Sequence, residues 1–450
     1  MLRLATIQFL RSGGVRAGLG FLLVAGLVSL LVGRQFLDRQ ARAVAETAQF
    51  QREDFARHAE YQQGEIGLLL YYVRFSLVNQ TPALAGLAIG QRDVNPPVQR
   101  VTIRTLEAQK YDADLTNPAN LLLGNLDFSF VLLYLFPLVI IAFCYNLISG
   151  EKERGTWRLV AVQSRHLMRF VGLLFAIRTG LVLSVLALLL GLAVWVLGIP
   201  ADGTFWAFAG VSVLYVGVWF GICFWVVSGQ KSSATNALLL LISWLAGLVI
   251  VPALVNAWVV ATYPVPEAVA TTLKQRKGYH EKWDLPKEPT LNRFYAHYPQ
   301  FQNLPPANTK FDWTWYYAMQ HLGDVEAAPK ARALREKLAR RAEVSERIGW
   351  FVPTLHAQLQ LTELTRSGLT NQLRFLDETT RFHEQKRLYY YPKIFTNAPV
   401  SGERWADVPV ATFTDTRPLS AGRLLAPLLI FGAVVVGLGW LNFRRTIYQY

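Results

Sequence analysis

Six apolar stretches constrain this chain more than any other feature. Each is nearly free of charge and approaches the roughly 20 residues that a helix needs to cross a ~30 Å hydrocarbon core. The stretches are Gly18–Gly33, Phe128–Ile148, Thr179–Leu197, Thr204–Val227, Asn236–Thr262 and Leu424–Leu441. Backbone polar groups must pair with one another in lipid, so the sequence predicts six membrane-spanning helices.

Two of these stretches differ from the others. The first is short, follows basic residues and lacks a small-residue cleavage site before the charged segment that comes next. We therefore expect a retained first span and not a cleavable signal peptide. The fifth is long and contains Pro252, which is expected to kink it.

Basic residues in the short loops predict the orientation. Residues 1–17 carry three arginines and no acid, and residues 149–170 carry five basic residues against two acidic ones. The 228–235 turn and the C-terminal tail are also basic, whereas the 198–203 loop has one acid and no base. The positive-inside rule makes the basic side cytoplasmic, with both termini there. The net charge of +14 then reflects loops facing anionic lipid, and nucleic acid is not an expected partner.

The predicted fold class is an all-α polytopic membrane protein with six transmembrane helices and two large, mainly helical extracytoplasmic insertions. Five segments follow. They are a cytoplasmic amphipathic N-terminus with the first span (1–33), a first insertion (34–126), spans two to five with a cytoplasmic element at 149–166 (127–261), a second insertion (262–420), and the sixth span with a cytoplasmic tail (421–450).

Within the insertions, helices are the main expected element. Residues 38–63 are polar and free of Pro and Gly, so they are expected to continue the first span as a helix. The second insertion begins with a loop-like part rich in proline and aromatic residues, which includes Trp313. From Val325 to Tyr391 its pattern is helical, with breaks at Gly349 and Pro353.

The sequence offers few candidate metal or ligand sites. Both cysteines, Cys144 and Cys223, lie in apolar stretches, so no disulfide joins the insertions. Five histidines of the second insertion lack metal-ligand spacing, and no metal site is expected: His280, His297, His321, His356 and His383. The Tyr and Trp clusters of this insertion fit interfacial anchoring and core packing. A ligand-facing aromatic surface is the alternative.

Catalytic motifs are missing as well. No GxxxxGK[ST] phosphate loop occurs, and Gly229–Ser232 resembles one only superficially. No nucleophile stands beside a base. The chain is therefore not expected to be an enzyme or to bind a cofactor, and any energy it uses must come from a partner.

The segment after the second span carries the candidate coupling residues. We expect Gly150 to end the second-span helix and Thr156 to cap a short second helix. Leu159, Val160 and Val162 would turn an apolar side toward the membrane or other helices. The charged elbow consists of Glu151, Lys152, Glu153, Arg154, Gly155 and Thr156. The alternative is a charged turn that only marks the membrane edge.

Two further features concern helix packing. Small residues at Gly18, Gly20 and Gly26 predict that the first span lies close to another helix, either within the chain or in a second subunit. Arg178 precedes a sufficient apolar run, so its side chain is expected to reach the cytoplasmic interface. An intramembrane functional charge is the alternative.

Taken with these spans, the Glu-x-Glu-x-Gly-Thr element at 151–156 resembles that of ABC-2 type transporter permeases. Further segments resemble the subgroup with large periplasmic insertions between spans one and two and between spans five and six. They are residues 87–93, Asn117-Pro118, 124–128, Pro252 with Asn256, Tyr263-Pro264 and, loosely, Gly368, Thr370 and Phe375, where Leu369 interrupts an expected Gly-Thr pair.

The resemblance implies an exporter of the bacterial inner membrane. Residues 151–156 would form the coupling helix that contacts an ATPase subunit. Two permease subunits, identical or paralogous, would assemble with two ABC ATPase subunits that bind ATP and Mg. A second hypothesis is ATPase-driven mechanotransmission or scaffolding, in which the insertions act on a periplasmic partner without transport. A membrane-bound enzyme is a weaker third hypothesis, because no acid-base or metal cluster appears.

Overall fold

The computed structural model describes residues 2–107, 109–111, 125–163, 167–267, 281–283, 286–305 and 309–446. Within these ranges, six helical stretches are long and apolar enough to cross a membrane, each with an 18-residue window whose mean hydropathy lies between 2.0 and 2.7. They are Gly13–Tyr61, Phe128–Glu153, Leu167–Leu197, Gly203–Ser228, Ser233–Thr262 and Ala421–Thr446. All six predicted spans fall inside them. The chain is thus a mainly helical, multi-pass membrane protein.

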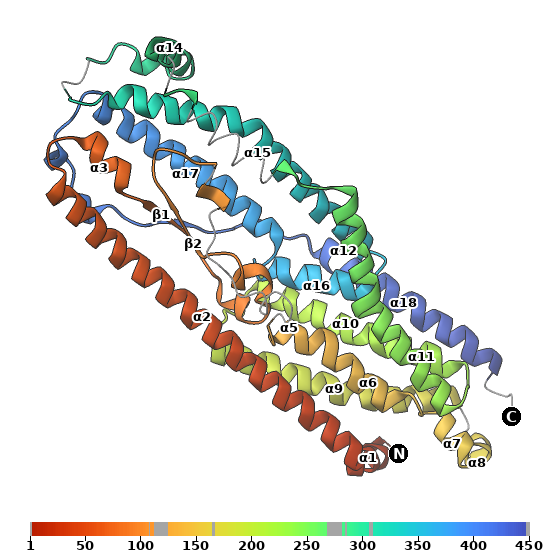
Figure 1. Ribbon diagram of the computed structural model, residues 1–450. Helices are drawn as coiled ribbons and strands as arrows, with labels where there is room; N and C mark the ends of the chain where they lie inside the picture. The colour runs from red at the N-terminus through yellow and green to blue at the C-terminus, as the bar shows by residue number, and fades with distance from the viewer. Residues whose placement is uncertain are drawn as a thin grey trace.

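These helices form a bundle at one end of an elongated molecule (Figure 1). The first span belongs to α2 (Gly13–Tyr61), and the second is built from α5 (Phe128–Phe130), η4 (Val131–Leu135) and α6 (Phe136–Cys144). The third and fourth spans are α9 (Leu167–Leu197) and α10 (Gly203–Ser228). α11 (Ser233–Leu245), η5 (Ala246–Ile250) and α12 (Val251–Thr262) make the fifth, and α18 (Ala421–Thr446) makes the sixth.

Both chain ends lie at the same end of the bundle (Figure 1). There, α1 (Leu2–Arg11) precedes α2, and the short helices α7 (Ser149–Glu153) and α8 (Trp157–Gln163) connect spans two and three. The second and fourth spans are the most buried, because apolar side chains surround them on several sides. The fifth is the most exposed.

The second and fifth spans each contain a turn of π-helix. η4 frees backbone carbonyls that side chains of other spans satisfy, since Tyr215 Oη donates to Leu133 O at 2.8 Å and Trp244 Nε1 donates to Tyr134 O at 3.1 Å. η5 ends just before Pro252, and Thr354 Oγ1 donates to Gly247 O within it. The irregularity expected at Pro252 is therefore a π-turn directly before it.

The long helix α2 confirms that residues 38–63 continue the first span. Helix α2 runs unbroken over 49 residues and ends at Tyr61. Its second half leaves the bundle and lies along the other helices of the far end (Figure 1). We call the described parts of residues 34–126 and 262–420 the distal module.

The helices of the second insertion are longer than predicted. α15 covers Trp313–Gly349 and α17 covers Leu369–Phe395, with α16 (Pro353–Leu364) between them. The breaks at Gly349 and Pro353 are confirmed. Placing Trp313 in a loop was wrong, because the Asp312 carboxylate accepts from Trp315 N at 2.9 Å and caps a helix that starts there. α14 (Lys287–His297) precedes them.

A small sheet joins the two insertions, and the sequence analysis did not predict it. β1 (Phe75–Asn79) pairs antiparallel with β2 (Val98–Val101) and parallel with β3 (Ala411–Phe413). The strand order is β2-β1-β3, so the central strand of the first insertion binds a strand more than 300 residues later in the chain. The two insertions are therefore one folded unit.

Aromatic side chains fill the core of the distal module. The buried cluster combines Phe55 of α2 and Phe75 of β1 with aromatic residues of α15 and α17. Its largest members include Phe294, Tyr317, Tyr390 and Tyr391. This supports core packing for most of the aromatic residues, since their rings contact one another across the cluster.

Helix α16 does not belong to that core. Ala357, Leu361 and Leu364 pack into the bundle cluster instead, beside residues of spans two, four and six. His356 Nε2 lies 3.0 Å from Leu424 O of α18. α16 thus inserts between the spans at the distal end of the bundle (Figure 1).

Candidate coupling site

Residues 149–163 form a helical elbow at the end of the bundle that holds both termini (Figure 1). α6 ends at Cys144, a turn follows, and α7 covers Ser149–Glu153. The expectation that Gly150 ends the second-span helix was wrong, because Gly150 lies inside α7. Gly155 ends α7 instead, with a φ of +74° that favours glycine.

The carboxylate of Glu153 binds the start of the fifth span. It accepts from Ser233 N at 2.7 Å and from Ser233 Oγ at 2.8 Å, so it satisfies an N–H group that the first turn of α11 leaves open. Ser232 also caps this helix, accepting from Thr235 N at 3.2 Å. Glu153 thus contacts the start of span five while its side chain remains exposed, and the expectation of an elbow that presents two carboxylates stays a prediction.

The other charged groups of the elbow remain at its surface. Thr156 directly precedes α8, and its hydroxyl donates to the backbone oxygen and the carboxylate of Glu151. Arg154 Nη1 lies 3.8 Å from the same carboxylate. Lys152 is half-buried on α7. Glu151, Glu153 and Arg154 are therefore charges that a partner can reach.

The apolar residues of α8 divide between two faces. Trp157 is buried in a cluster with residues of spans two, three, four and six, which are Leu147, Ile148, Leu167, Val171, Val227 and Phe443. Leu159 and Val162 are 61% and 84% exposed, so they do not pack against other helices of this chain. Of the two environments expected for them, the membrane and other helices, the membrane remains for these two residues; a partner subunit is a third.

Two of the three candidate packing glycines face other spans. A Cβ at Gly18 would lie 2.9 Å from the ring of Phe143, and one at Gly26 would overlap Leu189 of α9. No described atom lies within 4 Å of such a Cβ at Gly20. Span one is therefore packed through Gly18 and Gly26 within its own chain.

Arg178 is held inside the bundle at the same end. Its Nε donates to Phe143 O at 2.9 Å and its Nη1 to Leu174 O at 3.0 Å, while the guanidinium lies 4.5 Å from the ring centre of Phe9. The side chain thus joins α1, α6 and α9. This arrangement supports an anchoring role over a transport role.

The segment 87–93 is the main junction between the bundle and the distal module. The Asp127 carboxylate accepts from Ile89 N at 2.8 Å, and Ser129 N donates to Leu87 O at 2.9 Å, which ties the segment to the start of span two. Gln91 N donates to Ser367 O at 2.8 Å, next to the start of α17. Within the segment, Gly90 has a φ of +54° and lies too close to Ser367 for a side chain.

Arg92 is the central side chain of this junction. It donates to Arg366 O at 2.8 Å and Thr81 Oγ1 at 2.8 Å, and further bonds reach Asn79 and Asn371. Burial lowers the pKa of Arg92 to about 10, partly offset by Asp415, so it stays charged at neutral pH. Of the other segments with a family resemblance, Asn117-Pro118 and Gly124 lie outside the described residues.

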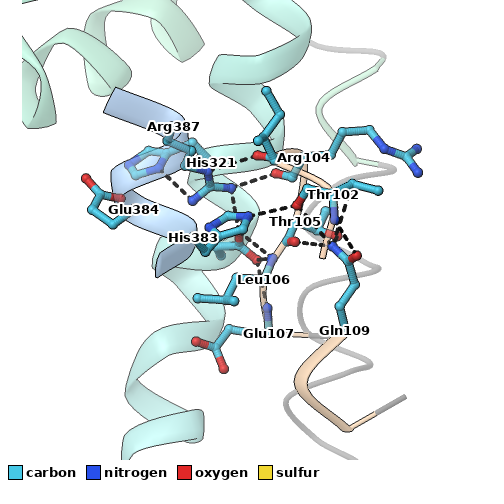
Figure 2. A network of polar contacts seen from close by, with 12 residues as sticks. Thr102, Arg104, Thr105, Leu106, Glu107, Gln109, His321, His383, Glu384 and Arg387 are labelled. Carbon is cyan, nitrogen blue, oxygen red and sulfur yellow. Dashed lines mark hydrogen bonds and ion pairs between the residues drawn. The ribbon is translucent and has the colours of Figure 1, made fainter. Parts of the chain in front are cut away.

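A second polar network lies inside the distal module (Figure 2). Asp324 of α15 forms a buried ion pair with Arg387 of α17 at 2.6 Å and accepts from Leu106 N at 2.9 Å. Arg387 also donates to Ile103 O at 3.1 Å and Arg104 O at 2.6 Å. The loop 102–107 of the first insertion is therefore held by side chains of the second.

Two histidines complete this network. His383 Nε2 lies 3.0 Å from Thr102 O, and His321 Nδ1 lies 3.2 Å from Arg387 Nη1. Burial, then the charge of Arg387, lowers the pKa of both, that of His321 to about 2. Among the described residues, no three His, Cys, Asp or Glu side chains are grouped so that they could hold a metal. His280 lies outside those residues.

Comparisons with known proteins give a match for one part of the chain. A family model described as a domain of unknown function (DUF3526) matches residues 268–414, which include α14 to α17 and β3. Comparisons with curated proteins and with solved structures give no match. The chain is a multi-pass membrane protein whose second insertion is similar to that family.

Proposed function

We propose that this chain is the permease subunit of an ABC-2 type transporter that exports a substrate across the bacterial inner membrane. Two copies, or one copy and a paralogue, would work with two separate ATPase subunits that bind ATP and Mg. The elbow 149–163 would receive the ATPase, with its end of the bundle in the cytoplasm. The distal module would then be periplasmic.

The contacts of the elbow carry this proposal. Trp157 belongs to a buried cluster with residues of spans two, three, four and six, and the Glu153 carboxylate accepts a hydrogen bond from the start of span five at 2.7 Å. The elbow is therefore tied to five of the six spans through this cluster and this bond. On its outer side, Arg154, Leu159 and Val162 are exposed. An inner side that is tied to the spans and an exposed outer side suit a part that transmits motion from a partner.

The distribution of charge supports the orientation. The end of the bundle with α1, α7, α8 and both termini is the end with the basic short loops (Figure 1). An Arg11→Cys variant in α1 should be shielded from a membrane-impermeant maleimide in intact cells and react after permeabilisation, while Arg381→Cys in α17 should react in intact cells. Both positions are exposed and neither lies on the face assigned to the ATPase, so the difference reports the membrane side. The opposite labelling pattern contradicts the orientation.

Substitutions on the outer face of α8 test the function. We expect Leu159→Asp with Val162→Asp to reduce ATPase co-purification and ATP hydrolysis by the complex about tenfold or more, because association would bury two carboxylates without partners. The melting temperature of the chain should not change, since neither side chain packs within it. Tyr61→Asp, at an exposed site in the distal module, is the matched control. Native association and hydrolysis in the double variant would refute the proposal.

Mechanotransmission is the second candidate function. It is favoured by the single folded unit that the two insertions form and by the continuous helix α2, which connects this unit to the bundle without a flexible joint. Such a protein would couple ATP hydrolysis to a periplasmic partner and pass nothing through the membrane. Substrate export into liposomes that contain the purified complex supports the permease. ATP hydrolysis that moves no co-purified small molecule supports mechanotransmission.

A further inference from the structure

A cavity of about 720 Å³ lies where the bundle meets the distal module. Its walls come from the α9–α10 connection, the C-terminal end of α16, and residues 415–418, which connect β3 to α18. We call residues 415–418 the strap. Apolar side chains that contribute to the lining include Leu84, Ile199, Leu364 and Leu424. Leu424 begins the predicted sixth span and Ile199 lies two residues after the third, so the cavity borders the predicted hydrocarbon region.

Two acidic residues line this cavity, and both are already engaged. Asp202 caps α10, accepting from Thr204 N at 2.9 Å and Phe205 N at 3.0 Å. Asp415 pairs with Arg374 at 2.5 Å, and its side chain is buried. The charge of Asp415 is therefore offset by Arg374, while Asp202 is exposed to solvent.

Two arginines line it as well, and they are less fully engaged. Arg366 has a φ of +54°, which is uncommon outside glycine, and donates through Nη2 to the carbonyl of Arg417 in the strap. Its Nη1 has no hydrogen-bond partner within the described residues and lies 3.7 Å from Glu363. The Arg417 guanidinium forms neither a hydrogen bond nor an ion pair with a described residue, and it is exposed. An available positive charge thus stands beside an apolar cavity.

The strap also borders a second cavity of about 530 Å³, on the side of the distal module. Charged side chains of α15 and α17 line this second cavity, including Arg335, Asp377 and Arg381. The strap therefore separates an apolar space next to the spans from a polar space outside them. An amphiphile fits this arrangement, with its tail on the inner side and its headgroup at the strap.

We propose that the cavity binds one acidic phospholipid, with the phosphate at Arg417 and acyl carbons against Leu84, Ile199 and Leu424. The volume lies in the range of ordinary ligand sites. The arginine supplies a charge-assisted contact for the phosphate, and the apolar side chains of the lining add contacts for acyl carbons that a small anion does not have. This site is independent of the proposed transport activity, since it needs no ATPase.

The test is lipid binding to the purified full chain in detergent, followed by native mass spectrometry. We expect one dioleoylphosphatidylglycerol to bind with higher affinity than dioleoylphosphatidylcholine. Glycerol 3-phosphate, which has the anion without the tails, should not bind measurably. Equal affinity for the two lipids, or equal binding of glycerol 3-phosphate, would overturn the proposal.

Variants locate the site. Arg417→Gln should lower the affinity for phosphatidylglycerol about tenfold, because one charge-assisted hydrogen bond is lost. Arg423→Gln, at an exposed arginine of α18 near the same end of the bundle, is the matched control and should bind normally. Ala207→Trp should block binding by filling the cavity while leaving Arg417 in place. Equal losses in the Arg417 and Arg423 variants would mean attraction to the general surface charge and would overturn the site.

Discussion

Replacing Asp324 by alanine tests whether the buried network holds the two insertions together. The variant leaves the Arg387 guanidinium, only 4% exposed, without its counter-ion. It also leaves the N–H groups of Leu106 and Glu107 without the carboxylate that accepts from them. Breaking one side of a buried ion pair typically costs about 3–5 kcal/mol, mostly because a charge is left buried and unpaired. For a folded unit of the size of the distal module, that loss of unfolding free energy corresponds to a fall in melting temperature on the order of 10 °C.

The same two helices supply the control. Arg335 of α15 pairs with Asp377 of α17 at 2.5 Å, but both side chains are more than a third exposed. Solvent screening makes such a pair worth about 0–1 kcal/mol, so Asp377→Ala should shift the melting temperature by at most a few degrees. Thermal unfolding of the purified chain, followed by tryptophan fluorescence, measures both. The reasoning is refuted if Asp324→Ala costs no more than Asp377→Ala, or if adding Arg387→Met restores none of the loss.

Three further predictions follow from individual contacts. His383 is buried and neutral, so its contribution to stability should be fully present above pH 6.5 and fall by about 1.4 kcal/mol per pH unit below it, as the unfolded chain takes up a proton that the folded chain does not. His321, whose pKa is lowered as well, adds a second loss of the same sign, so His383→Gln should reduce the fall in melting temperature between pH 7 and 5.5 without abolishing it. The exposed His297→Gln should leave this fall unchanged, and Glu107, whose pKa is raised by burial, acts in the opposite direction at lower pH. Gly26→Leu should lower the melting temperature by overlapping Leu189, whereas Gly20→Leu should leave it nearly unchanged, and equal effects would show that α2 does not pack on α9 through Gly26. Glu153→Ala should lower the melting temperature slightly, because the N–H of Ser233 loses its acceptor, and an unchanged melting temperature would show that this contact does not stabilise the fold.

Local patterns in the sequence predicted the elements that depend on local composition. The six spans follow from apolar runs, and the long α2 follows from an uninterrupted polar stretch after the first run. The breaks at Gly349 and Pro353 follow from backbone preferences of glycine and proline. The sequence prediction placed Trp313 in a loop, because the aromatic residues around it resemble a loop-like segment. Asp312 instead caps a helix that begins there.

Contacts between distant residues could not be predicted in the same way. β1 and β3 are short, and the pairing of Leu77 with Ala411 leaves no periodic signal in either segment. The bond between Glu153 and Ser233 joins residues 80 positions apart, so the carboxylate looked like part of a charged loop. The role of Arg92 could not be predicted for the same reason, because its partners Arg366 and Asn371 are distant in the sequence. Its position in the segment 87–93, which resembles the permease subgroup, pointed to a role for this residue.

Photocrosslinking from α8 tests the central claim most directly. A photoreactive amino acid at Val162, 84% exposed on the outer face of the elbow, is activated in intact cells, and the crosslinked protein is identified by mass spectrometry. The account predicts a crosslink to a polypeptide with a GxxxxGK[ST] phosphate loop, and none to that polypeptide from Tyr61 in the distal module. Absence of such a partner at Val162, or its capture from Tyr61 instead, would contradict the claim that an ATPase acts on this elbow.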